Sequence, residues 1–210
     1  MEQMAPGEIT PAQACGVAEE VQARLKAVAR AAEPAAVAVA ATLKRPQLRH
    51  IARKFRSNNE RFRREWIAVA PQERPEKRYE QMLDRLESIY GTLEAPQREV
   101  LRQRLAATHW DPEGMLARRQ QRQQDLLRIL GRISGGLPAP EGEALLRGWI
   151  ERLERPADPA WHATQQALLQ EGCATFAAVH QVTTAAQREK AVRRLRAWQR
   201  DLRELSAQQP

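Results

Sequence analysis

The residues of this chain best suited to binding chemistry are arginines and glutamines, and they gather in two stretches. The first stretch, residues 44–64, holds nine lysine and arginine residues and one acidic residue, Glu60. Since the whole chain of 210 residues carries a formal net charge of +8, the remainder is close to neutral. Such a concentration of positive charge indicates an acidic protein, an anionic lipid surface or a nucleic acid as partner, unless it is simply a solvated helix face.

The second stretch is Arg-Arg-Gln-Gln-Arg-Gln-Gln-Asp at residues 118–125. Two helical turns pass there without an apolar residue, which is typical of a helix that is exposed all round or lines a polar cavity. Together the two stretches predict a positive, polar and concave surface. The candidate residues of this surface are Arg49, Arg53, Arg56, Asn59, Arg63, Arg119, Arg122 and Gln123.

The side chains that usually carry catalysis or hold metals do not form a recognisable site. No serine lies in a nucleophile elbow, and there is no glycine-rich phosphate loop. The four histidines include no pair at the i, i+4 spacing of a helical zinc site: His50, His109, His162 and His180. We therefore expect no catalytic residue, no metal and no cofactor, and we predict that the chain is not an enzyme.

The elements that must position these residues are all helices. Alanine, leucine, arginine, glutamine and glutamate dominate the sequence, and no run of alternating β-branched residues indicates a strand. Prolines and glycines divide the chain into about nine helical segments, which predicts an all-α, irregular multi-helix bundle. The first segment should end near Ala32, before Pro34, and Pro34 should begin a short helix that reaches Leu43.

One long basic helix is predicted over residues 46–69. Its apolar positions alternate in steps of four and three, and Asn59 interrupts them. A buried asparagine normally finds an internal hydrogen-bond partner, although Asn59 could also make a polar contact inside a groove. The loop Ser-Gly-Gly-Leu-Pro that follows residue 133 is the clearest break in the chain. It predicts an N-terminal part, 1–134, and a C-terminal part, 135–210, packed as one compact unit.

Apolar residues recur at helical spacing in the first and last helices. Val17, Val21, Leu25 and Val28 share one face of the first helix. The last helix carries Val192, Leu195, Trp198, Leu202 and Leu205. This spacing is typical of a helix face that packs against other elements.

A short pattern, an aliphatic or Thr residue followed four positions later by Gln, recurs where helices should begin. Thr10 with Gln13, and Thr184 with Gln187, have the spacing of a capping box, in which each side chain bonds the backbone N–H of the other residue. Two weaker copies, 43–47 and 93–97, lack a capping hydroxyl and are interpreted as partial helix starts. The unequal spacing of the copies argues against a solenoid repeat.

Cys15 and Cys173 lie at opposite ends of the chain, and neither is part of a CxxC pair. In an oxidising compartment they could form a disulfide that ties the first helix to a late one. In a reducing compartment they would be two small buried residues. The sequence leaves both alternatives open.

The recurring pattern resembles the Leu-Thr-x-x-Gln motif of the Spy and CpxP group of periplasmic chaperones. A wider likeness, to an uncharacterised family of proteobacterial envelope lipoproteins, rests on three stretches: 55–66, 119–127 and 176–202. That resemblance implies an all-helical protein exported to the periplasm or anchored to the outer membrane, with no established activity. A signal peptide and a lipobox, which the resemblance would lead one to expect, are absent from this sequence.

Three functions remain open. The chain could be a periplasmic binding protein with chaperone-like action on unfolded clients, or a structural scaffold of the envelope with a protein partner. It could also bind nucleic acid or another polyanion. We do not favour nucleic acid, because the basic residues surround the helix predicted over residues 46–69 and no aromatic platform accompanies them. The sequence does not indicate the partner's identity or the oligomeric state.

Overall fold

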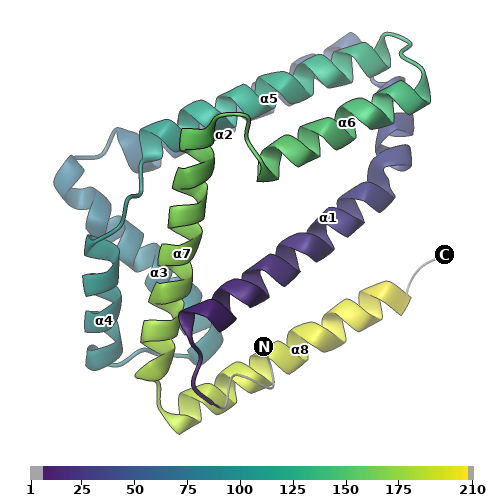
Figure 1. Ribbon diagram of the computed structural model, residues 1–210. Helices are drawn as coiled ribbons and strands as arrows, with labels where there is room; N and C mark the ends of the chain where they lie inside the picture. Colours follow the sequence, from purple (N-terminus) through teal and green to yellow (C-terminus); the bar gives the residue numbers. More distant parts are fainter. Residues whose placement is uncertain (1–6, 208–210) are drawn as a thin grey trace. The chain divides into compact units, whose positions relative to one another are not determined.

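The computed structural model describes residues 7–207, apart from the side chain of Glu154, as helices joined by loops (Figure 1). This range contains eight α-helices, one π-helical turn and one 3-10 turn, and no strand. The α-helices are α1 (Pro11–Thr42), α2 (Arg45–Phe62), α3 (Arg74–Tyr90), α4 (Ala95–Ala106), α5 (Pro112–Ser134), α6 (Ala139–Glu154), α7 (Pro159–Gln181) and α8 (Ala185–Ala207). The π-helical turn is η1 (Arg63–Ile67), and the 3-10 turn is η2 (Pro71–Glu73).

The all-α prediction is confirmed, but the number of α-helices is eight rather than about nine. The difference arises at Pro34, which lies inside α1 and does not end it. Proline in a helix interior costs about 3 kcal/mol, because it removes one hydrogen bond and crowds the preceding turn. Val37 and Ala40 are buried just beyond it, and their packing offsets that cost.

The described residues fall into two compact units that alternate along the chain. Unit 1 contains the residues up to Glu19, then 72–109, and those from Ala167 onward. Unit 2 contains residues 20–71 and 110–166. The Gly-Gly-Leu-Pro loop, which predicts a boundary at residue 134, lies inside unit 2, where it joins α5 to α6.

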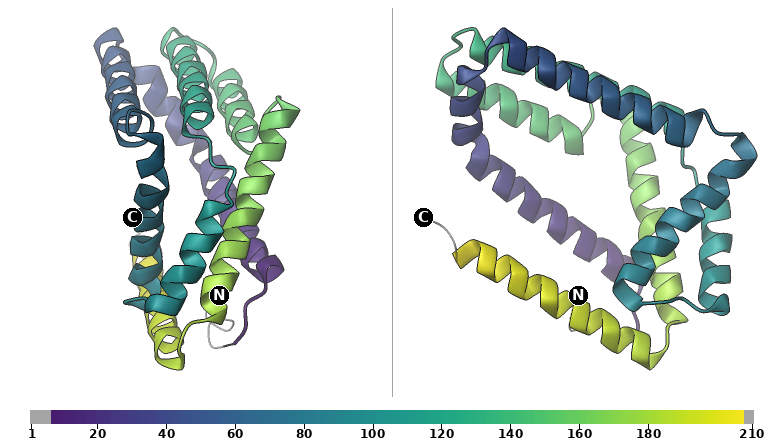
Figure 2. Two further views of the ribbon diagram at one scale, coloured as in Figure 1. Left: turned by 90° about the vertical axis from the view of Figure 1, so that its left-hand side faces the viewer. Right: turned by 180° about the vertical axis from the view of Figure 1, so that it is seen from behind.

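The core of unit 2 lies where α1, α5 and α6 meet. Buried Val37 and Ala40 of α1 pack with Ile129 and Ile133 of α5 and with Leu146 of α6. α6 runs beside α5, and α2 packs along α5 as well (Figures 1 and 2). The helix α5 is therefore the element that both other helices contact.

The core of unit 1 is built from two helix hairpins, α3–α4 and the second half of α7 with α8. Tyr90 and Leu101 from the first hairpin pack with Val179 and Ala191 from the second. α3 contacts both α4 and α8. α3 ends at Gly91, whose positive φ of 78° is a conformation that a glycine adopts without steric cost.

The predicted long basic helix 46–69 is shorter as an α-helix than expected. α2 ends at Phe62, and the chain continues as the π-helical turn η1, where the N–H of Ala68 donates to the carbonyl of Arg63 at 2.8 Å. In that turn Trp66 is buried, and its ring packs edge-on against Trp110 at a centroid distance of 4.9 Å. Within residues 7–207, no helix is long and apolar enough to cross a membrane.

Candidate binding surface

Four exposed arginines share one face, three of them on α2 and the fourth, Arg63, at the first position of η1. At about 100° per residue, Arg49, Arg53, Arg56 and Arg63 lie within an arc of about 80° around the helix axis, and all four side chains are exposed. We call these four residues the basic face. Glu60 lies on the same arc, and its carboxylate is 3.9 Å from the Arg63 guanidinium.

Asn59, which interrupts the apolar seam of α2, is buried and bonds to α5. Its amide N–H donates to the Gln123 side-chain oxygen at 2.7 Å. Two of the candidate surface residues are thus brought together, but as an internal contact between helices. The Asn59 carbonyl oxygen is buried without a hydrogen-bond partner among the described residues. Such a group costs roughly 1–3 kcal/mol of stability.

The polar run of α5 divides between two sides of the helix. Gln123 faces α2, as does Arg119, whose guanidinium lies 5.5 Å from the centre of the Phe62 ring. Arg122 is half-buried on another side, where its carbonyl accepts a hydrogen bond from the Trp149 indole at 3.0 Å. Burial lowers the pKa of the Arg122 guanidinium, and the positive charge of Arg119 lowers it further. The concave surface predicted from both stretches is thus two separate features, the basic face and the surroundings of Arg122.

An ion pair in unit 2 between a buried carboxylate and a half-exposed arginine was not predicted from the sequence. Glu33 of α1 is only 3% exposed, and its carboxylate accepts two hydrogen bonds from Arg147 of α6, at 2.7 and 3.0 Å. Its other carboxylate oxygen is buried without a partner among the described residues. The two residues are 114 positions apart, so no local pattern in the sequence could pair them.

Each of the four copies of the recurring pattern makes the same kind of hydrogen bond. In each, the Gln side-chain oxygen accepts from the backbone N–H three residues earlier: Gln13 from Thr10, Gln47 from Lys44, Gln97 from Glu94, and Gln187 from Thr184, at 2.7–2.9 Å. The reciprocal bond, from the Gln N–H to a threonine hydroxyl, occurs at Thr10 and Thr184, both at 3.2 Å. The partial helix starts at Lys44 and Glu94 therefore keep the glutamine half of the capping box.

Two of these glutamines also join the hairpins of unit 1. The amide groups of Gln97 and Gln187 donate to each other's oxygen atoms at 3.0 Å. Gln97 donates further to the Val182 carbonyl, and Gln187 to the Thr92 carbonyl, each at 2.9 Å. The starts of α4 and α8 are thereby locked together. Sequence reasoning identified the caps but missed this contact.

His180 connects the same region to the chain start. Its Nε2–H donates to the Gly7 carbonyl at 2.7 Å, so its Nδ1 accepts from the Tyr90 hydroxyl at 2.8 Å. Burial lowers the pKa of the fully buried His180 ring, and burial raises the pKa of Tyr90. His180 therefore serves as a neutral structural link between α7, α3 and the chain before α1.

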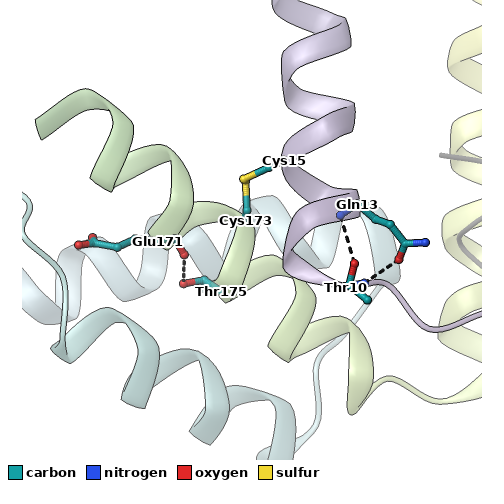
Figure 3. Close-up of a disulfide and its surroundings, with 6 residues drawn as sticks. All are labelled: Thr10, Gln13, Cys15, Glu171, Cys173 and Thr175. Atoms are coloured by element: carbon teal, nitrogen blue, oxygen red, sulfur yellow. Dashed lines mark hydrogen bonds between the residues drawn. A yellow bond between two sulfur atoms is a disulfide. The ribbon is translucent and has the colours of Figure 1, made fainter. Parts of the chain in front are cut away.

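Cys15 of α1 and Cys173 of α7 form a disulfide within unit 1, with their Cα atoms 5.3 Å apart (Figure 3). The Thr10 and Gln13 capping box begins α1 less than two turns before this bond, and Thr175 of α7 bonds the Glu171 carbonyl at 2.8 Å (Figure 3). The disulfide fixes the first turns of α1 against α7.

Apolar rows on α1 and α8 are exposed, although their spacing is typical of a packing face. Leu25 is 63% and Val28 66% exposed on α1, while Leu202 is 66% and Leu205 65% exposed on α8. Scattered apolar residues on a protein surface are ordinary, but a row at i, i+4 and i+7 is a continuous stripe. Both stripes therefore lie on the surface of the helices that carry them.

Comparison with known proteins finds a family whose model matches most of the chain. Residues 1–147 match the model of DUF6279, which is described as a family of unknown function. No curated protein and no solved structure matches the chain. Since the matched residues make up more than half of the chain, the protein belongs to the DUF6279 family of unknown function.

Proposed function

We propose that this protein is a non-enzymatic binding protein of the bacterial envelope, which captures acidic segments of unfolded or partly folded proteins. The observation that carries the proposal is the basic face of α2, where four arginines are exposed along one side of a helix. Guanidinium groups pair with carboxylates through two parallel hydrogen bonds, which makes an arginine row well suited to acidic side chains.

The exposed apolar stripes supply the second contact that a client would need. Positive charge attracts an acidic segment over distances of about 10 Å, and apolar surface holds the chain once it is close. Val21, Leu25 and Val28 on α1, which belong to the same unit as the basic face, are exposed residues of this kind. An unfolded client exposes both acidic and apolar side chains.

The envelope location is supported by the disulfide between Cys15 and Cys173. Disulfides persist in oxidising compartments such as the periplasm and are rare in the cytosol. The bond is consistent with a protein that works outside the cytosol, as the resemblance to envelope lipoproteins implies.

An aggregation assay tests this function. An acidic client is denatured, diluted and followed by light scattering, with and without equimolar protein. We expect suppressed aggregation, and we expect it to weaken as salt is raised because exposed charges are screened. Unchanged aggregation at stoichiometric protein would rule out the chaperone-like function. Tight binding to duplex or single-stranded DNA at physiological salt, without effect on the client, would identify a polyanion-binding protein instead.

A further inference from the structure

Unit 2 contains a pocket between α5, α6 and the start of α7. No residue of the basic face lines this pocket. Its volume is about 360 Å³, in the lower part of the range of ~300–1,000 Å³ that small-molecule sites occupy. Two indole rings, those of Trp149 and Trp161, line it together with Leu153, Pro156 and Ala157. The remaining lining residues are polar or charged: Arg118, Gln121, Arg122, Asp125, Arg152 and Asp158.

The walls of the pocket are held in place by contacts that do not need a ligand. The Trp149 indole N–H donates to the Arg122 carbonyl at 3.0 Å, which fixes the orientation of that ring. Asp158 accepts from the backbone N–H groups of Ala160 and Trp161, so it caps α7 and also pairs with Arg118. The Arg118 guanidinium in turn lies 5.6 Å from the centre of the Trp161 ring. The aromatic walls are therefore preorganised.

The charges of the pocket are not balanced. Asp158 pairs with Arg118, and Asp125 pairs with Arg128. Among the described side chains, no carboxylate pairs with the half-buried Arg122 or with Arg152. The lining therefore holds two guanidinium groups, those of Arg122 and Arg152, beyond these two ion pairs. One carboxylate has two oxygen atoms, which can accept hydrogen bonds from both of these guanidinium groups.

From this arrangement we infer that the pocket binds a flat apolar group that carries one carboxylate. The indole rings would stack on the apolar group, and Arg122 and Arg152 would hold the carboxylate. Such a ligand has two sources, a free aromatic acid or the end of a protein chain with an aromatic last residue. The inference does not depend on the proposed client binding, because no residue of the basic face lines the pocket.

Calorimetric titration of the full chain tests the inference. The probes are 3-phenylpropionate and its uncharged amide, and a short peptide that ends in phenylalanine, with a free or an amidated C-terminus. We expect each acid to bind at least about 10-fold more tightly than its amide, since a hydrogen bond to a charged group contributes on the order of one decade or more. Equal affinity of acid and amide, or no measurable binding of either acid, would overturn the inference.

Three variants make the titration specific to this pocket. R122Q and R152Q should each weaken binding of the acids about 10-fold and leave the weak binding of the amides unchanged. R132Q removes a charge from the exposed surface of the same helix, outside the pocket, and should bind like wild type. If R132Q weakens binding as much as R152Q does, the net charge of the protein explains the binding, and the inference is overturned. Circular dichroism confirms that each variant is folded.

The two probe types distinguish the two ligand sources. A peptide that binds at least about 10-fold more tightly than 3-phenylpropionate would identify the chain end as the ligand, because the additional backbone contributes contacts. Similar affinities would identify a free aromatic acid. Either result supports the carboxylate site, and neither requires that the protein suppress aggregation.

Discussion

At the scale of single residues, the glutamines of the capping pattern contribute unequally to the stability of the fold. Gln187 is buried and bonds to Thr184, to Gln97 and to the Thr92 carbonyl. Gln47 is exposed, and its side-chain oxygen accepts a hydrogen bond from the backbone N–H of Lys44. The same sequence pattern therefore contributes to tertiary packing at one site and to a helix start at the other.

Replacement of Gln187 by alanine should lower the free energy of unfolding by about 2–3 kcal/mol. The helix start loses about 1 kcal/mol, and the buried polar groups of Gln97 and Thr92 lose partners at a further cost. The control is Q47A, for which we expect a loss of at most about 1 kcal/mol. Urea denaturation followed by circular dichroism measures both. Equal losses in the two variants would contradict the role of the Gln97–Gln187 contact.

His180 should make the stability of the protein depend on pH near neutrality. Its ring is neutral in the folded state, with a pKa below the usual 6.5, because burial and the nearby Arg188 oppose protonation. In the unfolded chain the ring takes up a proton as the pH falls through about 6.5. The unfolded state is therefore favoured below that pH, by up to about 1.4 kcal/mol per pH unit until the folded-state pKa is reached.

Unfolding free energies measured between pH 7.5 and 5.5 test this. Wild type should lose stability over the window, and H180Q should show a smaller slope, whatever its stability at pH 7.5. H50Q, which alters an exposed histidine, should follow wild type. If the slopes of wild type and H180Q are the same, His180 does not control the pH dependence.

At the scale of helices, the disulfide is the strongest link between α1 and α7 in unit 1. It joins residues 158 positions apart, and a cross-link over a long loop restricts the unfolded chain strongly. Reduction, or the double variant C15A/C173A, should lower the free energy of unfolding by about 2–4 kcal/mol. Denaturation with and without dithiothreitol measures this. The double variant should not respond to dithiothreitol; free reaction of both wild-type thiols with a maleimide would show that the bond is absent.

Helix boundaries were predictable where the signal is local. Asp111 accepts a hydrogen bond from the N–H of Gly114, and α3 stops at Gly91, both as their residue types indicate. The predicted break at Pro34 is wrong, because packing of Val37 and Ala40 with α5 and α6 outweighs the local cost of proline. The π-helical turn after Phe62 was likewise not predictable, since it accompanies the packing of Trp66 on Trp110.

At the scale of the whole molecule, sequence reasoning identified residues but not their neighbours. Asn59 and Gln123 were both candidates for the same surface, yet their hydrogen bond depends on how α2 lies along α5. The pairing of Glu33 with Arg147 and of Gln97 with Gln187 requires the tertiary fold, because each pair is far apart in sequence. The basic composition predicts a positively charged surface. Which arginines lie on the same face is determined by the fold.

The alternation of the two units along the chain also depends on the tertiary fold and could not be predicted from the sequence. α1 begins in unit 1 and continues in unit 2, and α7 begins in unit 2 and continues in unit 1. A long helix gives no sequence signal at such a boundary, because its local hydrogen bonding is uninterrupted. The glycine-rich loop after residue 133 gave a clear signal, but for a turn between two helices of the same unit.

We propose above that the arginines of the basic face bind acidic protein segments. The most direct test of this claim is titration of a fluorescent, unfolded acidic client with two double variants of equal net charge. R53Q/R56Q removes two charges from the basic face, and K54Q/R61Q removes two exposed charges from elsewhere around the same helix. We predict that R53Q/R56Q weakens binding about 10-fold or more, while K54Q/R61Q stays within about 3-fold of wild type. Equal weakening in the two variants would contradict the claim, because net charge alone would then explain the binding.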